Sequence, residues 1–267
     1  MVKNSYFLVL LSLVGFIYSC SETQEKDEPF KTSVTLTSFN DFIPSYVSEA
    51  PNLEIEPGSY YNHVIGKYSI DALVDSLNAN AVYWKIKDSR ENKIYQGHAL
   101  DGKKTGWWEM LYNKTLICCG NYIANKKSGF WRYYPIGGES HKLVNFKNDT
   151  LDGLAQEYSA DSILLSEGKY LNGLKSDYWK FFYNNGKIKE KGYFYDSYKS
   201  GWWQSFESNG NLIEEASYSR NEISGYVKKY LNGVLFEEGK FFDGKRRGTW
   251  KCYDENGKLK RIKEYGE

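Results

Sequence analysis

The sequence predicts an all-β protein, an elongated antiparallel meander of about seven β-hairpin repeats in a twisted, mostly single-layered sheet. A Gly-Trp-Trp-like motif recurs with anchors at residues 82, 106, 129, 153, 177, 201, 225 and 248, so every step is 23 or 24 residues. Aromatic residues make up 17% of the chain and glycine is abundant, which is typical of short strands joined by tight turns. Asn-Gly and Asp-Gly pairs between the aromatic segments indicate hairpin turns.

The best-preserved copy is Gly201-Trp202-Trp203, and each repeat is named here by its anchor residue, counted as position zero. Position +2 carries Trp84, Trp108, Trp131, Trp179, Trp203 and Trp250. Position +5 carries Leu111, Tyr134, Tyr158, Phe182, Phe206, Tyr230 and Tyr253. Because side chains alternate along a strand, we expect positions +2 and +5 on opposite faces, each with its own aromatic row.

The rest of the repeat predicts the turns and the second strand. Position −9 is small, usually glycine as in Gly97, Gly120, Gly168, Gly192 and Gly239, and position −7 is aromatic. Asn185-Gly186, Asn209-Gly210, Asn232-Gly233 and Asn256-Gly257 predict type I′ turns, and pairs such as Asp101-Gly102 predict the second turn. Each repeat should hold two strands of roughly six residues, about fourteen strands in all.

This pattern, roughly Gly-x-Tyr-x-Asn-Gly-Lys-x-x-Gly-x-Trp-x-x-Tyr-x-x-Asn-Gly, resembles the MORN-repeat variant of bacterial YwqK-type proteins, over about residues 82 to 267. Repeat 153 departs most, because it lacks both tryptophans and the Asn-Gly turn. The resemblance implies an elongated, twisted sheet. It also implies an interaction or membrane-association module, in a family whose members are often named antitoxins.

The amino terminus predicts an exported lipoprotein. Lys3 and an apolar run over 6–18 form a signal peptide of residues 1–20, too short to span a bilayer comfortably. Its end, Ile17-Tyr18-Ser19-Cys20, resembles a bacterial lipobox, which implies lipid attachment at Cys20 in the cell envelope, at the outer membrane. An ordinary signal peptide or an anchor helix is the alternative, and a periplasmic or surface orientation is left open. The acidic stretch 21–30 predicts a flexible tether.

Residues 31–81 fall outside the repeat frame and predict an irregular cap over the first repeat, since the ends of repeat arrays need covering. Within them, Val34 to Thr37 predicts a strand. The apolar spacing over 69–77, with Ser69 as N-cap, predicts a short amphipathic helix.

The aromatic rows have two interpretations. They are either cross-strand packing or a surface that binds a partner, because contiguous exposed aromatic surface marks interaction sites. The candidate binding residues are Trp108, Trp131, Trp179, Trp203, Trp250, Tyr134, Tyr158 and Tyr230.

The second turns are often basic, which predicts a cationic ridge along one long edge of the sheet. Its candidate residues are Lys103, Lys104, Lys126, Lys127, Lys245, Arg246 and Arg247. These are either ordinary solvated turn residues or a weak docking site for anionic lipid or polysaccharide.

No motif predicts catalysis, a cofactor or a metal. His63, His98 and His141 lack metal-ligand spacing, and Cys118, Cys119 and Cys252 are expected to be free thiols, because the repeat frame separates Cys252 from the other two. The net charge of +1 gives no drive toward nucleic acid. We therefore expect a non-enzymatic, lipid-anchored envelope protein that binds another protein or serves as a scaffold. A glycan-binding module and an antitoxin-like immunity protein are the alternatives.

Overall fold

The computed structural model describes residues 32–35, 52–55, 58, 60–65, 68–74, 81–137 and 140–266, which belong to one compact unit. Every regular element in these residues is a strand, so none of them forms a helix long and apolar enough to cross a membrane. Cys20, the signal peptide and the acidic tether lie outside the described residues.

The strands of the amino-terminal segment are β1 (Thr32–Thr35), β2 (Asn52–Ile55), β3 (Tyr60–Ile65) and β4 (Tyr68–Val74). The repeat region forms β5 (Ala81–Asp88), β6 (Lys93–Leu100), β7 (Lys103–Tyr112), β8 (Thr115–Ile123), β9 (Lys126–Tyr133), β10 (Ser140–Lys147), β11 (Thr150–Ser159), β12 (Leu164–Leu171), β13 (Leu174–Phe182), β14 (Ile188–Tyr195), β15 (Tyr198–Phe206), β16 (Leu212–Ser219), β17 (Glu222–Leu231), β18 (Val234–Phe242), β19 (Lys245–Tyr253) and β20 (Leu259–Tyr265).

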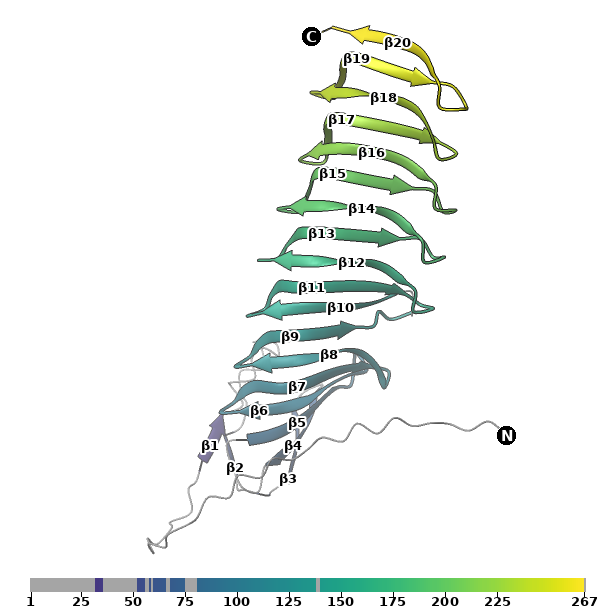
Figure 1. Cartoon of the computed structure of the whole chain (residues 1–267). Coiled ribbons are helices and arrows are strands. Elements are labelled where there is room, and N and C mark those ends of the chain that lie inside the picture. Colours follow the sequence, from purple (N-terminus) through teal and green to yellow (C-terminus); the bar gives the residue numbers. More distant parts are fainter. Residues whose placement is uncertain are drawn as a thin grey trace, which may run out of the picture. The chain divides into compact units, whose positions relative to one another are not determined.

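The strands from β3 to β20 form one antiparallel meander in which each strand pairs with its neighbours in sequence (Figure 1). In the described ladders β3 pairs only with β4, and β20 only with β19, so the sheet is open. The predicted hairpin meander is confirmed. Its strands are longer than the roughly six residues predicted, up to 10 in β7, because the ladders continue through bulges and into two-residue turns.

The helix predicted over 69–77 is wrong, because residues Tyr68–Val74 form strand β4. Ile70 and Ala72 are buried while Leu73 is exposed, which is the two-residue period of a strand. β4 pairs with β5 along its whole length, so β3 and β4 extend the repeat sheet where an irregular cap was expected. β1 confirms a strand near the predicted Val34 to Thr37, and it pairs with β2 in a separate two-stranded sheet.

From repeat 106 on, the anchor residue of each repeat sits at a bulge with a left-handed backbone. Gly201 has φ 66°, and the pairing of β14 with β15 shifts register beside it, between Gly192 and Tyr193. Asp177, the one non-glycine anchor among the later repeats, has φ 60°. The left-handed region favours glycine and tolerates Asp, which explains why the anchor is so constant.

The core is a column of tryptophans, and from β7 on each of them lies flat on a glycine of the preceding strand. Trp203 in β15 pairs with Gly192 in β14, and a Cβ added to Gly192 would come within 2.3 Å of the indole. The indole N–H donates to the carbonyl of Tyr193 over 3.0 Å. The same arrangement recurs for Trp108, Trp131, Trp179 and Trp250. Burying one indole removes about 150–250 Å² from water and contributes roughly 4–6 kcal/mol.

Two repeats replace this pair with smaller partners of matching size. In repeat 153, Ala155 at position +2 faces Val144 at position −9. In repeat 225, Val227 faces Ala216, and both are fully buried. From repeat 106 on, a side chain at position −9 occurs only where the residue at +2 is not tryptophan.

The turns are of two kinds. Asn232 and Gly233 both have positive φ, as predicted for a type I′ turn, and the second turns, such as Asp243-Gly244, share this conformation. The type I′ prediction is wrong at Asn185-Gly186, Asn209-Gly210 and Asn256-Gly257, where only the glycine has positive φ. There the turn is longer, and a side-chain oxygen accepts a backbone N–H group inside the loop. The acceptor is the side-chain amide oxygen of Asn185 or Asn209 in two of these turns and the carboxylate of Asp254 in the third.

We expect Gly192→Ala to destabilise the protein by about 1–3 kcal/mol, because its methyl group overlaps the indole of Trp203. The measurement is urea unfolding. The same change should cost less in a Trp203→Val background, which recreates the Ala216–Val227 pair. Gly266→Ala is the control, since a Cβ there meets no atom within 4 Å. Equal costs in both backgrounds would contradict the packing model.

Candidate functional site

One face of the sheet, called here the tryptophan face, carries positions +2, +4 and −7 of the repeats. Its tryptophans Trp108, Trp131, Trp179, Trp203 and Trp250 are at most 3% exposed. Neighbouring rings hold them, as where Phe181 stacks on Trp179 at 5.9 Å and Phe194 meets the ring of Trp203 edge-on at 5.0 Å. The prediction that these five tryptophans form a binding surface does not fit their burial, because they are the core of the sheet.

The predicted basic ridge is divided between the two faces. Lys104, Lys127 and Arg246 lie over rings of the tryptophan face; the guanidinium of Arg246 is 4.0 Å from the Trp250 ring centroid. Lys103, Lys126 and Lys245 are exposed. Arg247 is half-buried and donates to the carbonyl of Gly266. Adjacent residues of a strand point to opposite faces, so a Lys-Lys pair in sequence does not form one charged surface.

The opposite face, called here the open face, presents a row of large apolar side chains at position +1. Exposure in the row runs from 38% for Tyr178 to 59% for Tyr226. Its members are Trp107, Phe130, Leu154, Tyr178, Trp202 and Tyr226. Over β12 to β15 the row is flanked by further exposed apolar residues, which are Leu171, Leu174, Tyr193, Tyr195 and Tyr198. Contiguous exposed apolar side chains are common at interaction sites, which makes this row the candidate binding surface.

The row at +1 was not predicted as the binding surface, because the tryptophan at +2 is the more regular feature of the repeat. A signal was available. All eight tryptophans lie at +1 or +2, and alternation places the two positions on opposite faces. Trp202 and Trp203 show the result, with 42% and 3% exposure. The glycine at −9 also identifies +2 as the buried member, since the indole requires that space.

Position +5 lies on the open face, as alternation predicted, but its rings are only half-exposed. Tyr134, His141 and Tyr158 stack in sequence, with ring centroids 6.0 and 4.8 Å apart. The Tyr230 hydroxyl donates to Glu215 over 2.8 Å. Between the rows at +1 and +5 run polar pairs such as Lys180 with Glu167. The open face therefore combines an exposed apolar row with a polar middle line.

The open face is hollowed near repeat 153, where a cavity of about 290 Å³ is present. Phe130, Leu154 and Tyr178 line it, together with the charged pair of Glu167 and Lys180. Leu154 is the aliphatic member of the row at +1, between two aromatic ones. The repeat that departs most from the sequence pattern thus borders a depression in the surface.

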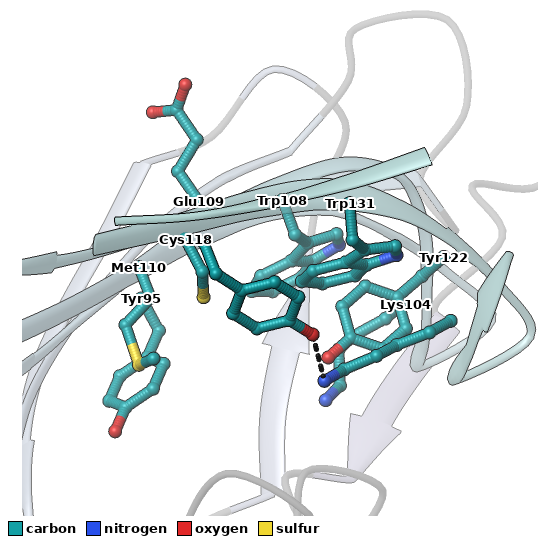
Figure 2. Close-up of a pocket in the computed structure, with 10 residues that line it drawn as sticks. Tyr95, Lys104, Trp108, Glu109, Met110, Cys118, Tyr122 and Trp131 are labelled. Carbon is teal, nitrogen blue, oxygen red and sulfur yellow. Dashed lines mark hydrogen bonds between the residues drawn. The ribbon is translucent and has the colours of Figure 1, made fainter. Parts of the chain in front are cut away.

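A second cavity, of about 240 Å³, lies on the tryptophan face over β6 to β9 (Figure 2). Its walls are Trp108, Trp131, Tyr122, Tyr133, Tyr95, Met110 and Cys118, with the two lysines Lys104 and Lys127. The Lys127 ammonium donates to the Tyr133 hydroxyl over 2.9 Å, and Glu109 points to the other side of the sheet (Figure 2).

The second cavity contains a thiol and a phenol whose pKa values are shifted by burial. Burial raises the pKa of the Cys118 thiol, so it is protonated at neutral pH and is a poor nucleophile. Burial likewise raises the pKa of Tyr133. Cys118, Cys119 and Cys252 are free thiols. Among the described residues no group of three or more His, Cys, Asp or Glu side chains is placed to hold a metal ion.

Comparison with known families finds the MORN repeat variant at two places, residues 178–196 and 246–266. The first match contains Trp179 of repeat 177, and the second contains Arg246 and Trp250 of repeat 248. No curated protein matches the chain.

The hydrogen bond between Tyr253 and Glu238, on the open face, predicts that the stability of the fold depends on pH. The hydrogen bond to Glu238 raises the pKa of Tyr253 to about 12. The neutral tyrosine therefore stabilises the fold below pH ~10, the ordinary tyrosine value, and this contribution is lost as the pH rises through about 12. Glu238→Gln should return the pKa of Tyr253 toward its ordinary value, as followed by NMR of its ring.

The control for this titration is Glu255→Gln, which removes an exposed carboxylate of the neighbouring turn and should leave the pKa of Tyr253 unchanged. Identical Tyr253 titrations in the Glu238→Gln variant and the parent protein would show that the carboxylate is not the cause.

Proposed function

We propose that this chain is a non-enzymatic binding protein, anchored through lipid on Cys20 in a bacterial cell envelope, at the outer membrane, whose open face takes another protein. The observation that carries this is the exposed row Trp107, Phe130, Leu154, Tyr178, Trp202 and Tyr226. Aromatic side chains are enriched in protein interfaces, because they bury much area at a small cost in conformational entropy.

The two faces divide stability and binding between them. Outside the cavity over β6 to β9, the tryptophan face is filled by its own rings and cations, so a protein partner there would displace the core. The row at +1 makes no comparable contribution to the core, and its members repeat every two strands, about 9–10 Å apart. A preformed row of this kind suits a partner with a long, flat or extended contact surface.

The recurrent carboxylates are explained by packing, which favours a non-enzymatic role. Glu215 accepts from Gln204 and Tyr230, Glu238 accepts from Tyr253, and Glu237 pairs with Arg246. Each carboxylate is held by partners that the repeat itself supplies.

Glycan binding is the second candidate, and exposed Trp107 and Trp202 favour it, because flat indole faces stack on sugar rings. In the antitoxin-like alternative implied by the resemblance, the protein partner is a toxin. Glycan binding and the antitoxin-like role would both use the row at +1. Experiments on that row therefore distinguish them by identifying the bound molecule, a glycan or a protein.

Trp202→Ala and Trp203→Ala form a matched pair of neighbouring tests. Trp203→Ala should cost about 3–5 kcal/mol of stability, because it empties the core, whereas Trp202→Ala should cost less than about 1 kcal/mol. Trp202→Ala should instead weaken partner binding at least tenfold, as expected for an interface residue worth about 2 kcal/mol. Urea unfolding and co-purification from solubilised envelopes measure the two effects.

A photo-crosslinking residue at position 202 should give one discrete protein adduct in intact envelopes, while the same residue at exposed Glu255 should give none. Retention on polysaccharide that Trp202→Ala abolishes, without a protein adduct, would assign the face to glycans. Adducts of equal yield from both positions, or binding unchanged by Trp202→Ala, would overturn the proposal.

A further inference from the structure

The cation at position −2 covers the tryptophan of its own repeat, and in two repeats a carboxylate at position −11 neutralises it. In repeat 201, Lys199 lies 4.2 Å from the Trp203 ring centroid and pairs with Glu190. In repeat 248, the Arg246 guanidinium binds both oxygens of Glu237, over 2.6 and 2.8 Å. Repeats 201 and 248 thus place a cation, an indole and a carboxylate in one fixed arrangement on the tryptophan face.

Repeat 129 keeps the cation and the indole but not the carboxylate. Lys127 lies 4.7 Å from the Trp131 ring centroid, and position −11 is Cys118. Among the ion pairs of the described residues, none involves Lys127. Repeat 106 has the same substitution pattern, with Tyr95 at −11 beside Lys104.

The cavity of Figure 2 lies at this point, and both lysines line it. Glu109 is its one acidic lining residue, and the Glu109 carboxylate lies on the other side of the sheet, where Gln96 donates to it over 2.8 Å. The Lys127 ammonium therefore lies in a half-enclosed space with aromatic walls, and none of the described carboxylates pairs with it. An ion there is screened less than on an open surface, so an anion is attracted strongly.

We propose that this cavity binds a carboxylate carried on a small apolar or aromatic body, with the ligand carboxylate on Lys127 in the place that Glu190 and Glu237 fill in the later repeats. The carboxylate is chosen because the chain itself uses that group with the same cation and indole. The apolar body fits walls made by Trp108, Tyr122 and Trp131. The site is on the face opposite the row at +1, so it is independent of the protein-binding proposal.

The test uses benzoate as the probe and the full chain, with calorimetry and the fluorescence of Trp108 and Trp131 as readouts. Saturable binding is expected, with no binding of the uncharged methyl benzoate. Lys127→Gln should weaken benzoate binding at least tenfold, and Lys126→Gln, at the adjacent exposed lysine, should leave it unchanged. Absence of saturable binding, or equal binding by the Lys127→Gln protein, would overturn the proposal.

Cys118→Glu supplies a sharper variant, because it installs at position −11 the residue that repeats 201 and 248 already have. The new carboxylate should occupy the site and abolish benzoate binding, whereas Cys118→Ala should retain it. Thermal unfolding checks that each variant is folded. If Cys118→Glu does not fold, the comparison of Lys127→Gln with Lys126→Gln decides.

The carboxylate has two possible sources, a free small acid or the end of a peptide. A short peptide ending in phenylalanine with a free carboxylate, compared with its C-terminal amide, distinguishes them. Binding of benzoate and of the free-carboxylate peptide supports a site for chain ends, and binding of benzoate alone supports a small acid. Binding of the amide as tightly as the free-carboxylate peptide would show that Lys127 does not recognise the charge.

Discussion

The stacking of an indole on the glycine of the neighbouring strand is the contact on which the rest of this sheet depends. A single-layered sheet has no second layer to bury its apolar side chains, so Trp203 lies flat on the backbone at Gly192 and bonds the carbonyl of Tyr193. Phe181, at +4 of the preceding repeat, and Phe194, at −7, close its edges, and the cation at −2 covers its face. Each such pair of adjacent strands thus buries its own tryptophan. Because every such pair needs the same contact, the repeat is regular.

The same contact assigns the two faces their roles. Once position +2 is buried on one face, alternation directs +1 to the other, where no equivalent covering is present and the side chains are exposed. The bulge at the left-handed anchor lies between these positions and the preceding turn, and it keeps the pattern in register from repeat to repeat. Stability and the proposed recognition therefore depend on adjacent residues but not on the same residues.

Four repeats depart from the common pattern in their core residues or in their charges. Repeats 153 and 225 replace tryptophan and glycine with aliphatic pairs, Ala155 with Val144 and Val227 with Ala216, and they also replace the cation with Leu151 and Ile223. These positions change together because each fills space that another leaves. Repeats 106 and 129 differ in charge, since Tyr95 and Cys118 stand where Glu190 and Glu237 stand later, and a cavity lies beside them.

The sequence by itself determined the repeat length, the antiparallel meander and the positions of glycine and aromatic residues, because these follow from local backbone geometry and period. It predicted a helix where Tyr68–Val74 forms a strand, since a short apolar run fits either period until its partner, β5, is known. Only the tertiary structure decided which of Trp202 and Trp203 is buried, and that Lys126 is exposed while Lys127 covers Trp131. The reason is that burial is set by the glycine and the rings of neighbouring strands, and not by the residue's own type.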